Sequence, residues 1–274
     1  MADPRSYNHT THRGANNRRW LAIGVLAVLG VIFLSLANWQ LNRAEQRRQI
    51  AAQIEAGRAA PPVRISPTTD FEALAPWQSI DAEGKWLSQW SVLLDNRNLD
   101  GKPGLWLASL FEYAPKRALL VVRGWIPRPI GQYNRLPDIT EPTQTILIQG
   151  EAASHVPRLY DLSDESSFIP RQATVSPTPK GLALDLSTLA RAQNISVDQM
   201  ASASGLAVAP VVLLQTGGPE DAHSTQFIRR WPQPSIDADK NVGYAMQWTG
   251  FALIAFTAMG VLLWRNRRHA KIRQ

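Results

Sequence analysis

The stretch "LAIGVLAVLGVIFLSLA" (21–37) contains no charged residue and lies between two tryptophans, Trp20 and Trp39. A helix that rises about 1.5 Å per residue covers roughly 28 Å between these tryptophans, close to the hydrocarbon core of a bilayer at about 30 Å. A second apolar stretch, "GYAMQWTGFALIAFTAMGVLLW" (243–264), ends at Trp264. Tryptophan at both ends of a span is typical of the membrane–water interface. The sequence therefore predicts two transmembrane helices, over 20–39 and 243–264.

The positive charge of the chain is concentrated in its two tails. Residues 1–19 contain four Arg and one Asp, residues 265–274 contain four Arg and one Lys without an acid, and the whole chain carries +7. The body between them is nearly neutral, which argues against a basic groove for nucleic acid. The basic tail after the second span places the C-terminus in the cytoplasm. Two spans then place the basic tail 1–19 there too and make residues 40–242 an extracytoplasmic domain.

The first apolar stretch has an alternative interpretation as a cleaved signal peptide, because "SLA" (35–37) has the small-x-small pattern of a cleavage site. The length of the stretch and the helical pattern that follows it favour an uncleaved span. The chain has no cysteine, which excludes disulfides, cysteine-based zinc sites and covalent c-type haem attachment.

The central region alternates between short β-rich runs and turn residues. Its predicted strands are 79–86, 91–97, 104–113, 118–126, 145–152 and 210–216, with turns at 100–104 and 113–117. Helices are predicted at 41–57, as a continuation of the first span, at 182–193 and at 196–204. The fold class is thus a membrane protein in which two helices, N-in and C-in, flank a mainly antiparallel β (α+β) domain.

Motifs of catalysis or metal binding are not found in the central domain. Its two histidines, His155 and His223, lie in separate predicted loops without the spacing of a metal site, and no nucleophile elbow or P-loop is present. The four Met are scattered, which argues against copper handling. We therefore expect no enzymatic activity, no catalytic residues and no resident metal.

Polar and aromatic residues gather at the outer end of each predicted span. Trp39, Gln40 and Arg43 follow the first span, and Tyr244, Gln247 and Trp248 open the second. In an antiparallel hairpin these two groups lie at the same depth, and Tyr244 and Trp248 share a helix face. Headgroup anchoring explains the aromatic residues but not the two amides and Arg43. A ligand site and a helix–helix contact both remain open.

Four motifs in order resemble the surfeit locus protein 1 family of cytochrome c oxidase assembly factors. They are Trp39-Gln40-Leu41 with Arg43, Asn96-Arg97 followed by Pro103-Gly104, Arg123-Gly124-Trp125-Ile126-Pro127, and Tyr244-Ala245-Met246-Gln247-Trp248. The resemblance extends over both spans and most of the domain between them. For the third motif we favour a structural role, with Gly124 allowing a sharp exit from the strand 118–123 and Trp125 packing in the core or on the membrane-facing surface.

The resemblance implies a role in inserting haem a into the catalytic oxidase subunit, with that subunit, haem a synthase and membrane lipid as partners. A haem between the two helices would have Trp39 and Trp248 as apolar walls and Arg43 beside a propionate. Asn241, however, stands where the family carries a proposed haem-ligating His, and an amide does not replace imidazole on iron. The iron ligand would then be Met246 or His223, or the protein binds no haem.

We therefore expect an assembly factor without catalysis of its own, in the inner membrane of a bacterium, with its central domain in the periplasm. The short tail 1–19, rich in His and Asn, is unlike a mitochondrial transit peptide. The alternative is a structural chaperone that stabilises an oxidase intermediate without binding haem.

Overall fold

The computed structural model describes residues 8–128, 136, 139–159, 168–179, 181–218 and 227–271, with side chains from residue 17 to residue 268. The chain divides into two units, one of residues 1–52 and 234–274 and the other of residues 53–233. The helix α1 (Asn8–Ala59) passes from the first unit into the second. The predicted helical continuation over 41–57 is confirmed, since α1 is unbroken to Ala59.

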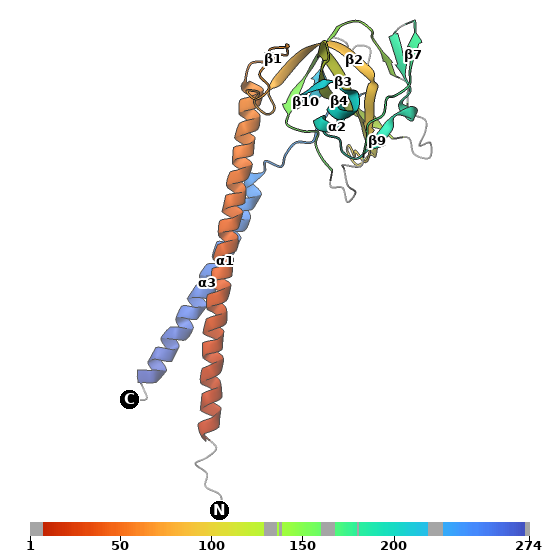
Figure 1. Ribbon diagram of the computed structural model, residues 1–274. Helices are drawn as coiled ribbons and strands as arrows, with labels where there is room; N and C mark the ends of the chain where they lie inside the picture. Colours follow the sequence, from red (N-terminus) through yellow and green to blue (C-terminus); the bar gives the residue numbers. More distant parts are fainter. Residues whose placement is uncertain are drawn as a thin grey trace, which may run out of the picture. The chain divides into compact units, whose positions relative to one another are not determined.

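The first unit is a pair of antiparallel helices, α1 and α3 (Ala238–Lys271), drawn in red-orange and blue in Figure 1. Among the described residues, two helical segments are long and apolar enough to cross a membrane, Asn17–Ala59 and Ala238–Arg268. They contain the predicted spans. At the end of this unit next to residue 234, Arg47 Nη1 donates to the carbonyl of Asp237 at 2.6 Å.

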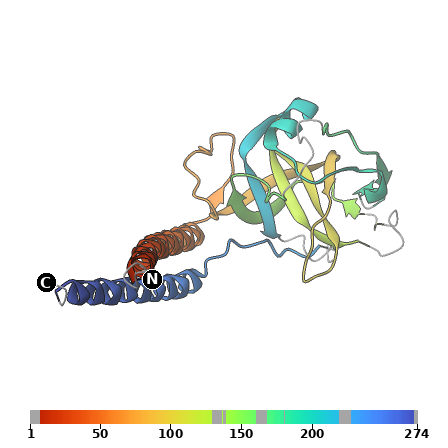
Figure 2. The ribbon, with the colours of Figure 1, turned by 90° about the horizontal axis from the view of Figure 1, so that it is seen from below.

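Five strands of the second unit close into a ring. They are β2 (Ser79–Leu94), β3 (Gly104–Ala114), β4 (Arg117–Pro127), β6 (Ile146–Ala153) and β10 (Ala207–Gly217). Neighbours pair in the order β2-β3-β4-β10-β6, and β6 pairs again with β2. The strands wrap around a common interior (Figure 2). Closure removes the exposed sheet edges of these strands.

The ring can close because β2 is long and changes partner along its length. Residues 79–84 pair with β6, whereas residues 85–94 pair with β3, with a register shift between Leu87 and Ser91. A bulge of this kind bends a strand sharply. Strands β10 and β4 run parallel and the other four pairs of the ring are antiparallel. A five-stranded Greek-key barrel of this order is the architecture of the OB-fold.

The six predicted strands are confirmed, with 79–86 and 91–97 merged into β2. The predicted turn at 100–104 is a tight one, since Asp100 and Gly101 have φ of 51° and 75°, as a type I′ turn requires. The sheet is mixed rather than uniformly antiparallel. Besides the β4–β10 pair, the short strands β1 (Val63–Arg64) and β9 (Ala190–Ala192) both run parallel to β2.

The predicted helix at 182–193 is wrong. This segment contains the strand β8 (Gly181–Leu184), the 3-10 turn η2 (Leu186–Thr188) and β9. Asp185 starts the turn by accepting a hydrogen bond from the Ser187 amide at 2.8 Å. Strand β8 joins β5 (Ile139–Glu141) and β7 (Val175–Thr178) in a separate three-stranded sheet. The predicted helix at 196–204 is confirmed as α2 (Val197–Ser204), which has a capping box between Ser196 and Gln199.

One of the three apolar clusters among the described residues joins the ends of β2, β3 and β4 to the three-stranded sheet. The other two are supplied by alternate residues of the barrel strands. One takes residues from all five ring strands, among them Ile80, Phe111, Val121, Ile148 and Leu213. The other lies on the opposite face of β3 and β4 and includes Met200 of α2. With both faces of β3 and β4 buried, the barrel is a rigid support for the side chains at its rim.

Candidate functional site

The contact between α1 and α3 follows a seven-residue repeat of small side chains. The small buried residues at this spacing are Gly30, Ala37 and Ala44 on α1, preceded by the larger Ile23, and Ala238, Ala245 and Ala252 on α3. A repeat of seven keeps one face of each helix against its partner, and small residues allow two backbones to approach closely in an apolar environment. We call this contact the seam.

Gly30 makes room for the Phe256 ring in the middle of the seam. A Cβ on Gly30 would lie 2.5 Å from the Phe256 ring, closer than real Cβ contacts allow. By contrast, Gly24 on the same helix has no atom within 4 Å of such a Cβ. Gly30 is therefore needed for packing, and Gly24 is not.

A polar contact between two amides interrupts the apolar seam. Asn241 Nδ2 donates to Gln40 Oε1 at 2.6 Å, and the two residues are only 8% and 9% exposed. The other oxygen of the pair, Asn241 Oδ1, is buried without a hydrogen-bond partner. A single buried polar pair in a helix seam fixes the register of the helices, because any slip leaves both amides unsatisfied.

Three aromatic rings pack together one heptad away from this amide pair. Trp248 stacks on Phe33 with ring centroids 5.8 Å apart and contacts Phe251 edge-on at the same distance. Phe33 and Phe251 are themselves 5.7 Å apart. The partner of Trp248 on α1 is thus Phe33, not Trp39.

The other predicted site residues lie outside the seam. Trp39 and Tyr244 are 58% and 55% exposed, and Gln247 is also exposed. Arg43 is exposed and donates to Gln46 Oε1 on its own helix at 3.1 Å. The structure therefore brings Gln40 and Asn241 together, packs Trp248 on Phe33 one heptad away, and leaves the other four side chains on the outer surface of the helices.

In the barrel unit, the motif residues Asn96-Arg97 and Pro103-Gly104 converge on one buried arginine. Arg97 donates to the carbonyls of Pro157 at 2.7 Å and Gln193 at 2.5 Å, and its guanidinium lies 4.3 Å from the Trp106 ring centroid. Burial lowers the pKa of Arg97 to about 10, so the side chain remains charged at neutral pH. Its backbone amide donates to the Gly104 carbonyl at 3.0 Å. The hydrogen bonds of Arg97 thus hold the segments at Pro157 and Gln193 against the barrel.

Trp125 of the third motif completes this arrangement. Its indole Nε1 donates to the Arg97 carbonyl at 2.7 Å, and its ring lies flat against Gly104, where a Cβ would collide with it. Trp125 is 3% exposed, so the structural role expected for it is confirmed, in the core. The expected sharp exit at Gly124 is wrong: β4 continues to Pro127, and Gly124 follows a register shift and makes room for Phe227.

Arg123 of the same motif forms a buried ion pair that the sequence did not indicate. Its Nη1 contacts Glu141 of β5, which also accepts from Ser88 Oγ of β2. Glu141 is 0% exposed and Arg123 5%. The guanidinium lies 3.9 Å from the Trp86 ring centroid. This cluster connects the three-stranded sheet to the barrel.

An open hollow of about 370 Å³ lies at the rim of the barrel, next to the buried Arg97. Its lining residues are Asp95, Asn96, Arg128, Arg191, Ala192 and Gln193. Arg128 Nη1 donates to Asp95 Oδ1 at 3.1 Å, and Asn96 has a φ of 63° that Asn tolerates better than most residues. The rim thus presents both donors and acceptors of hydrogen bonds.

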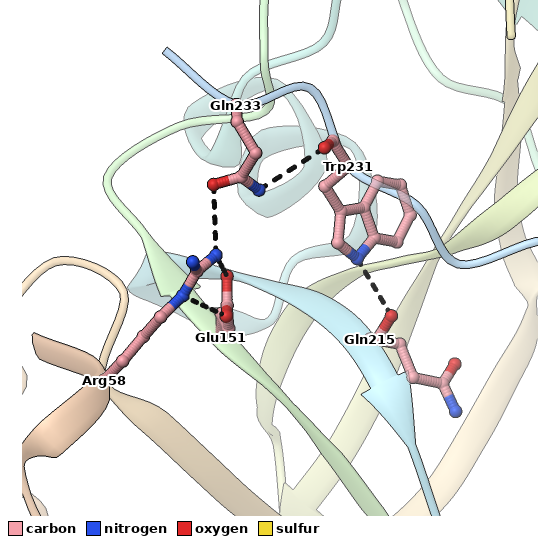
Figure 3. A network of polar contacts seen from close by, with 5 residues as sticks. All are labelled: Arg58, Glu151, Gln215, Trp231 and Gln233. Carbon is pink, nitrogen blue, oxygen red and sulfur yellow. Dashed lines mark hydrogen bonds and ion pairs between the residues drawn. The ribbon is translucent and has the colours of Figure 1, made fainter. Parts of the chain in front are cut away.

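The first and last segments of the barrel unit in sequence are hydrogen-bonded to each other and to the sheet. Figure 3 shows Arg58, in the last turn of α1, donating to both oxygens of Glu151 on β6, at 2.9 and 3.3 Å, and to Gln233 Oε1 at 3.0 Å. In the same segment, Trp231 Nε1 donates to the Gln215 carbonyl on β10 at 3.0 Å. The chain therefore enters and leaves the barrel unit at adjacent points.

Within the described residues, no three His, Asp or Glu side chains are arranged to hold a metal ion. His155 is exposed and contacts Ser154. His223, the loop residue considered above as an iron ligand, lies outside the described residues.

These observations define a class of protein: two long apolar helices with a small-residue seam, and between them in sequence a closed β-barrel. The profile of the SURF1 family matches residues 27–253, which include the whole barrel unit, most of α1 and the first part of α3. The chain belongs to the SURF1 family, known as cytochrome c oxidase assembly factors.

Individual relatives are distant. An uncharacterised SURF1-like protein of Mycobacterium bovis is 24% identical over 269 residues, covering 92% of this chain and 87% of that protein. A SURF1-like protein of Rickettsia conorii is 25% identical over 158 residues, 57% of this chain and 64% of that protein. The match to a SURF1-like protein of Rickettsia felis, at 26% identity, covers 37% of this chain and less than half, 44%, of that protein.

Proposed function

We propose that this chain is an assembly factor for cytochrome c oxidase, anchored in a bacterial inner membrane by α1 and α3. The observation that carries the proposal is the family match over 227 residues, from 27 to 253. This match covers both the helix seam and the barrel. In this proposal the barrel lies in the periplasm and both termini lie in the cytoplasm.

The outer surfaces of the two helices support the membrane anchoring. Large apolar side chains with exposures from 45% to 69% cover both helices, among them Leu21, Val28, Ile32, Leu253 and Ile254. Apolar surface of this extent is costly in water and is favoured in lipid. Exposed tryptophans mark the ends, with Trp20 and Trp264 at one end and Trp39 at the other. The basic tail after Trp264 supports the cytoplasmic side for the C-terminus.

A haem does not fit between α1 and α3 in the arrangement that the structure shows. At the level of the family's His position the two helices are in contact through the Asn241–Gln40 hydrogen bond of 2.6 Å, and Trp248 is stacked on Phe33. A macrocycle would have to break both contacts. Asn241 also lacks the imidazole that an iron ligand needs. We therefore place no haem in the seam.

Assistance to haem a insertion would then act through protein contact. Trp39, Arg43, Tyr244 and Gln247 form an outward face at one end of the helices, with aromatic rings and donors available to a neighbouring helix. We propose that this face binds the catalytic oxidase subunit, with haem a synthase as a second partner, and that the protein performs no catalysis itself. Aromatic rings and Arg are the residues most enriched at the centre of protein interfaces.

The second candidate is a chaperone that stabilises an oxidase intermediate and never contacts haem. The closed seam and Asn241 favour it. The two candidates differ in one measurable property. A factor that assists haem a insertion through protein contact should retain haem a synthase together with the catalytic subunit when purified, whereas a structural chaperone retains oxidase subunits without the synthase.

The test is purification of the tagged full-length protein from its own membranes in mild detergent, followed by mass spectrometry and a haem spectrum. We expect the catalytic oxidase subunit to be retained. Trp39→Ala with Tyr244→Ala should reduce the retained subunit at least tenfold. The matched control, Trp20→Ala with Trp264→Ala, removes two rings of similar exposure at the other end and should change it less than twofold. Equal losses in both pairs would show that the rings serve only as membrane anchors.

A further inference from the structure

The seam of α1 and α3 opens into a hollow at the end opposite to the amide pair. The hollow has a volume of about 260 Å³ and is lined by Arg19 of α1 and by Leu262, Arg265 and Asn266 of α3. Its position follows the heptad spacing. Arg19 lies two heptads before Phe33 and three before Gln40, and Leu262 lies three heptads after Asn241. The hollow is therefore the continuation of the seam, with Arg19 in the register of Gln40 and Asn266 in the register of Ala252.

Two guanidinium groups on facing helices repel each other unless an anion lies between them. Neither helix supplies one. No Asp or Glu occurs in the chain between Asp3 and Glu45, or anywhere after Asp239. Among the residues that the structure describes, the ion pairs of these helices lie away from this end, at Arg48–Glu45, Arg58–Glu151 and Lys240–Asp237. Among the described residues at this end of the helices, no side chain supplies the compensating negative charge.

The depth of the hollow identifies the source of that charge. Each arginine is next to an exposed tryptophan: Trp20 follows Arg19, and Trp264 precedes Arg265. Trp264 also lies 3.8 Å below the guanidinium of Arg268. Tryptophan is enriched at the headgroup level of a bilayer, so the two arginines and Asn266 reach the phosphate layer, while Leu262 lies beside the first part of the acyl chains.

We propose that this hollow binds the phosphate of one anionic phospholipid, with Arg19 and Arg265 as a clamp and Asn266 as a further donor. Guanidinium groups are well suited to phosphate because they present several donors in a plane. Basic hollows between helices on the cytoplasmic side are recurrent sites for anionic lipid headgroups. The inference rests on the proposed membrane anchoring and is independent of the proposed role in oxidase assembly.

The lipid would hold the cytoplasmic ends of the two helices together, as the amide pair holds them at the other end. Without it, the repulsion between Arg19 and Arg265 favours separation of the helices beyond Leu262. The protein would then be sensitive to the anionic lipid content of its membrane. Inorganic phosphate offers the same oxygens but no acyl chain to lie against Leu262, and this difference separates the two sources of phosphate.

The experiment is native mass spectrometry of the delipidated full-length protein in neutral detergent, titrated with phosphatidylglycerol or with phosphatidylcholine. We expect one phosphatidylglycerol per chain, bound at least tenfold more tightly than phosphatidylcholine. Arg19→Gln with Arg265→Gln should weaken binding at least tenfold. The control, Arg18→Gln with Arg267→Gln, removes the same charge from positions that do not line the hollow and should change it less than threefold.

Equal weakening in the two variant pairs would overturn the proposal, because it would mean that net charge and not the hollow attracts the lipid. Displacement of phosphatidylglycerol by inorganic phosphate at similar concentrations would also overturn it, in favour of a free phosphate site. The comparison of the two lipids and of phosphate uses the unaltered protein, so the test holds even if a variant fails to fold. Circular dichroism of each variant verifies that both helices are retained.

Discussion

Removal of the buried carboxylate of Glu141 should destabilise the barrel strongly. Arg123 would then be left charged and 5% exposed, with its planar group against Trp86 and no counter-ion. Breaking a buried ion pair by removing one partner costs about 3–5 kcal/mol, out of a typical total of about 5–15 kcal/mol. For a unit of this size that corresponds to a melting midpoint lower by about 6–20 °C. Glu141→Ala is thus expected to be among the most damaging single changes in the barrel.

The assay is thermal unfolding of the full-length protein in detergent, followed by near-ultraviolet circular dichroism of its tryptophans. Glu83→Ala provides the control: it also breaks an Arg–Glu pair, with Arg64 at 2.6 Å, but both side chains are more than half exposed. Such surface pairs contribute about 0–1 kcal/mol. A third variant, Arg123→Met with Glu141→Leu, replaces both charges by apolar groups and should recover most of the lost stability.

Two results would refute this reasoning. If Glu141→Ala lowered the melting midpoint no more than Glu83→Ala does, Arg123 would not be left as an isolated cation when its partner is removed. A midpoint for the double variant as low as that of Glu141→Ala would mean that the loss comes from packing of β5 and not from an uncompensated charge.

Three other changes test the packing of the two units. Gln40→Leu should lower the stability of the helix pair by about 1 kcal/mol, and adding Asn241→Leu should recover most of it, as measured by unfolding of the helices in detergent. Gly30→Leu should separate the helices and lower their melting midpoint, whereas Gly24→Leu, in open space, should not. Gly104→Val should displace the indole against it and cost the barrel about 1–3 kcal/mol in a denaturant titration.

Each of these has a contradicting outcome. Additive losses for Gln40→Leu and Asn241→Leu would mean that the two amides do not interact. Equal effects of Gly30→Leu and Gly24→Leu on the melting midpoint would mean that packing in the seam does not require a glycine at position 30. An unchanged midpoint for Gly104→Val would show that the Trp125 ring has room to move.

The helices and strands were predictable because their patterns are local. Apolar length with terminal tryptophans indicates α1 and α3, and the turn at Asp100-Gly101 separates β2 from β3 within a few residues. The wrong prediction at 182–193 has a local cause as well. Leu182, Leu184 and Leu186 alternate with period two, as in a strand, and the partners that make strands of this segment lie at 139–141, 175–178 and 92–94.

Closure of the barrel was not predictable, since it depends on pairs that are distant in sequence. The parallel pairing of β4 with β10 joins residues about ninety positions apart, and β2 reaches two partners only through its register shift. The ion pair of Arg123 with Glu141 follows from that packing. The seam had a pattern that was overlooked: a small residue at every seventh position, from Gly30 to Ala44 and from Ala238 to Ala252.

The site residues were placed at the correct helix ends, but their partners were not predictable. Helical periodicity puts Tyr244 and Trp248 on one face, yet the structure packs Trp248 in part and leaves Tyr244 outside. The direction of each side chain depends on the rotation of α1 against α3, which the heptad positions determine. The heptad positions of the seam include Gln40 and Asn241. They leave Trp39, Arg43, Tyr244 and Gln247 facing outward.

The central claim, a role in cytochrome c oxidase assembly, is tested most directly by a reduced-minus-oxidised spectrum of membranes. The comparison is between a strain that lacks this gene and its parent, with the gene restored on a plasmid as control. We predict a selective loss of the a-type haem signal, with b-type and c-type signals intact. An unchanged a-type signal together with normal oxidase turnover would contradict the account.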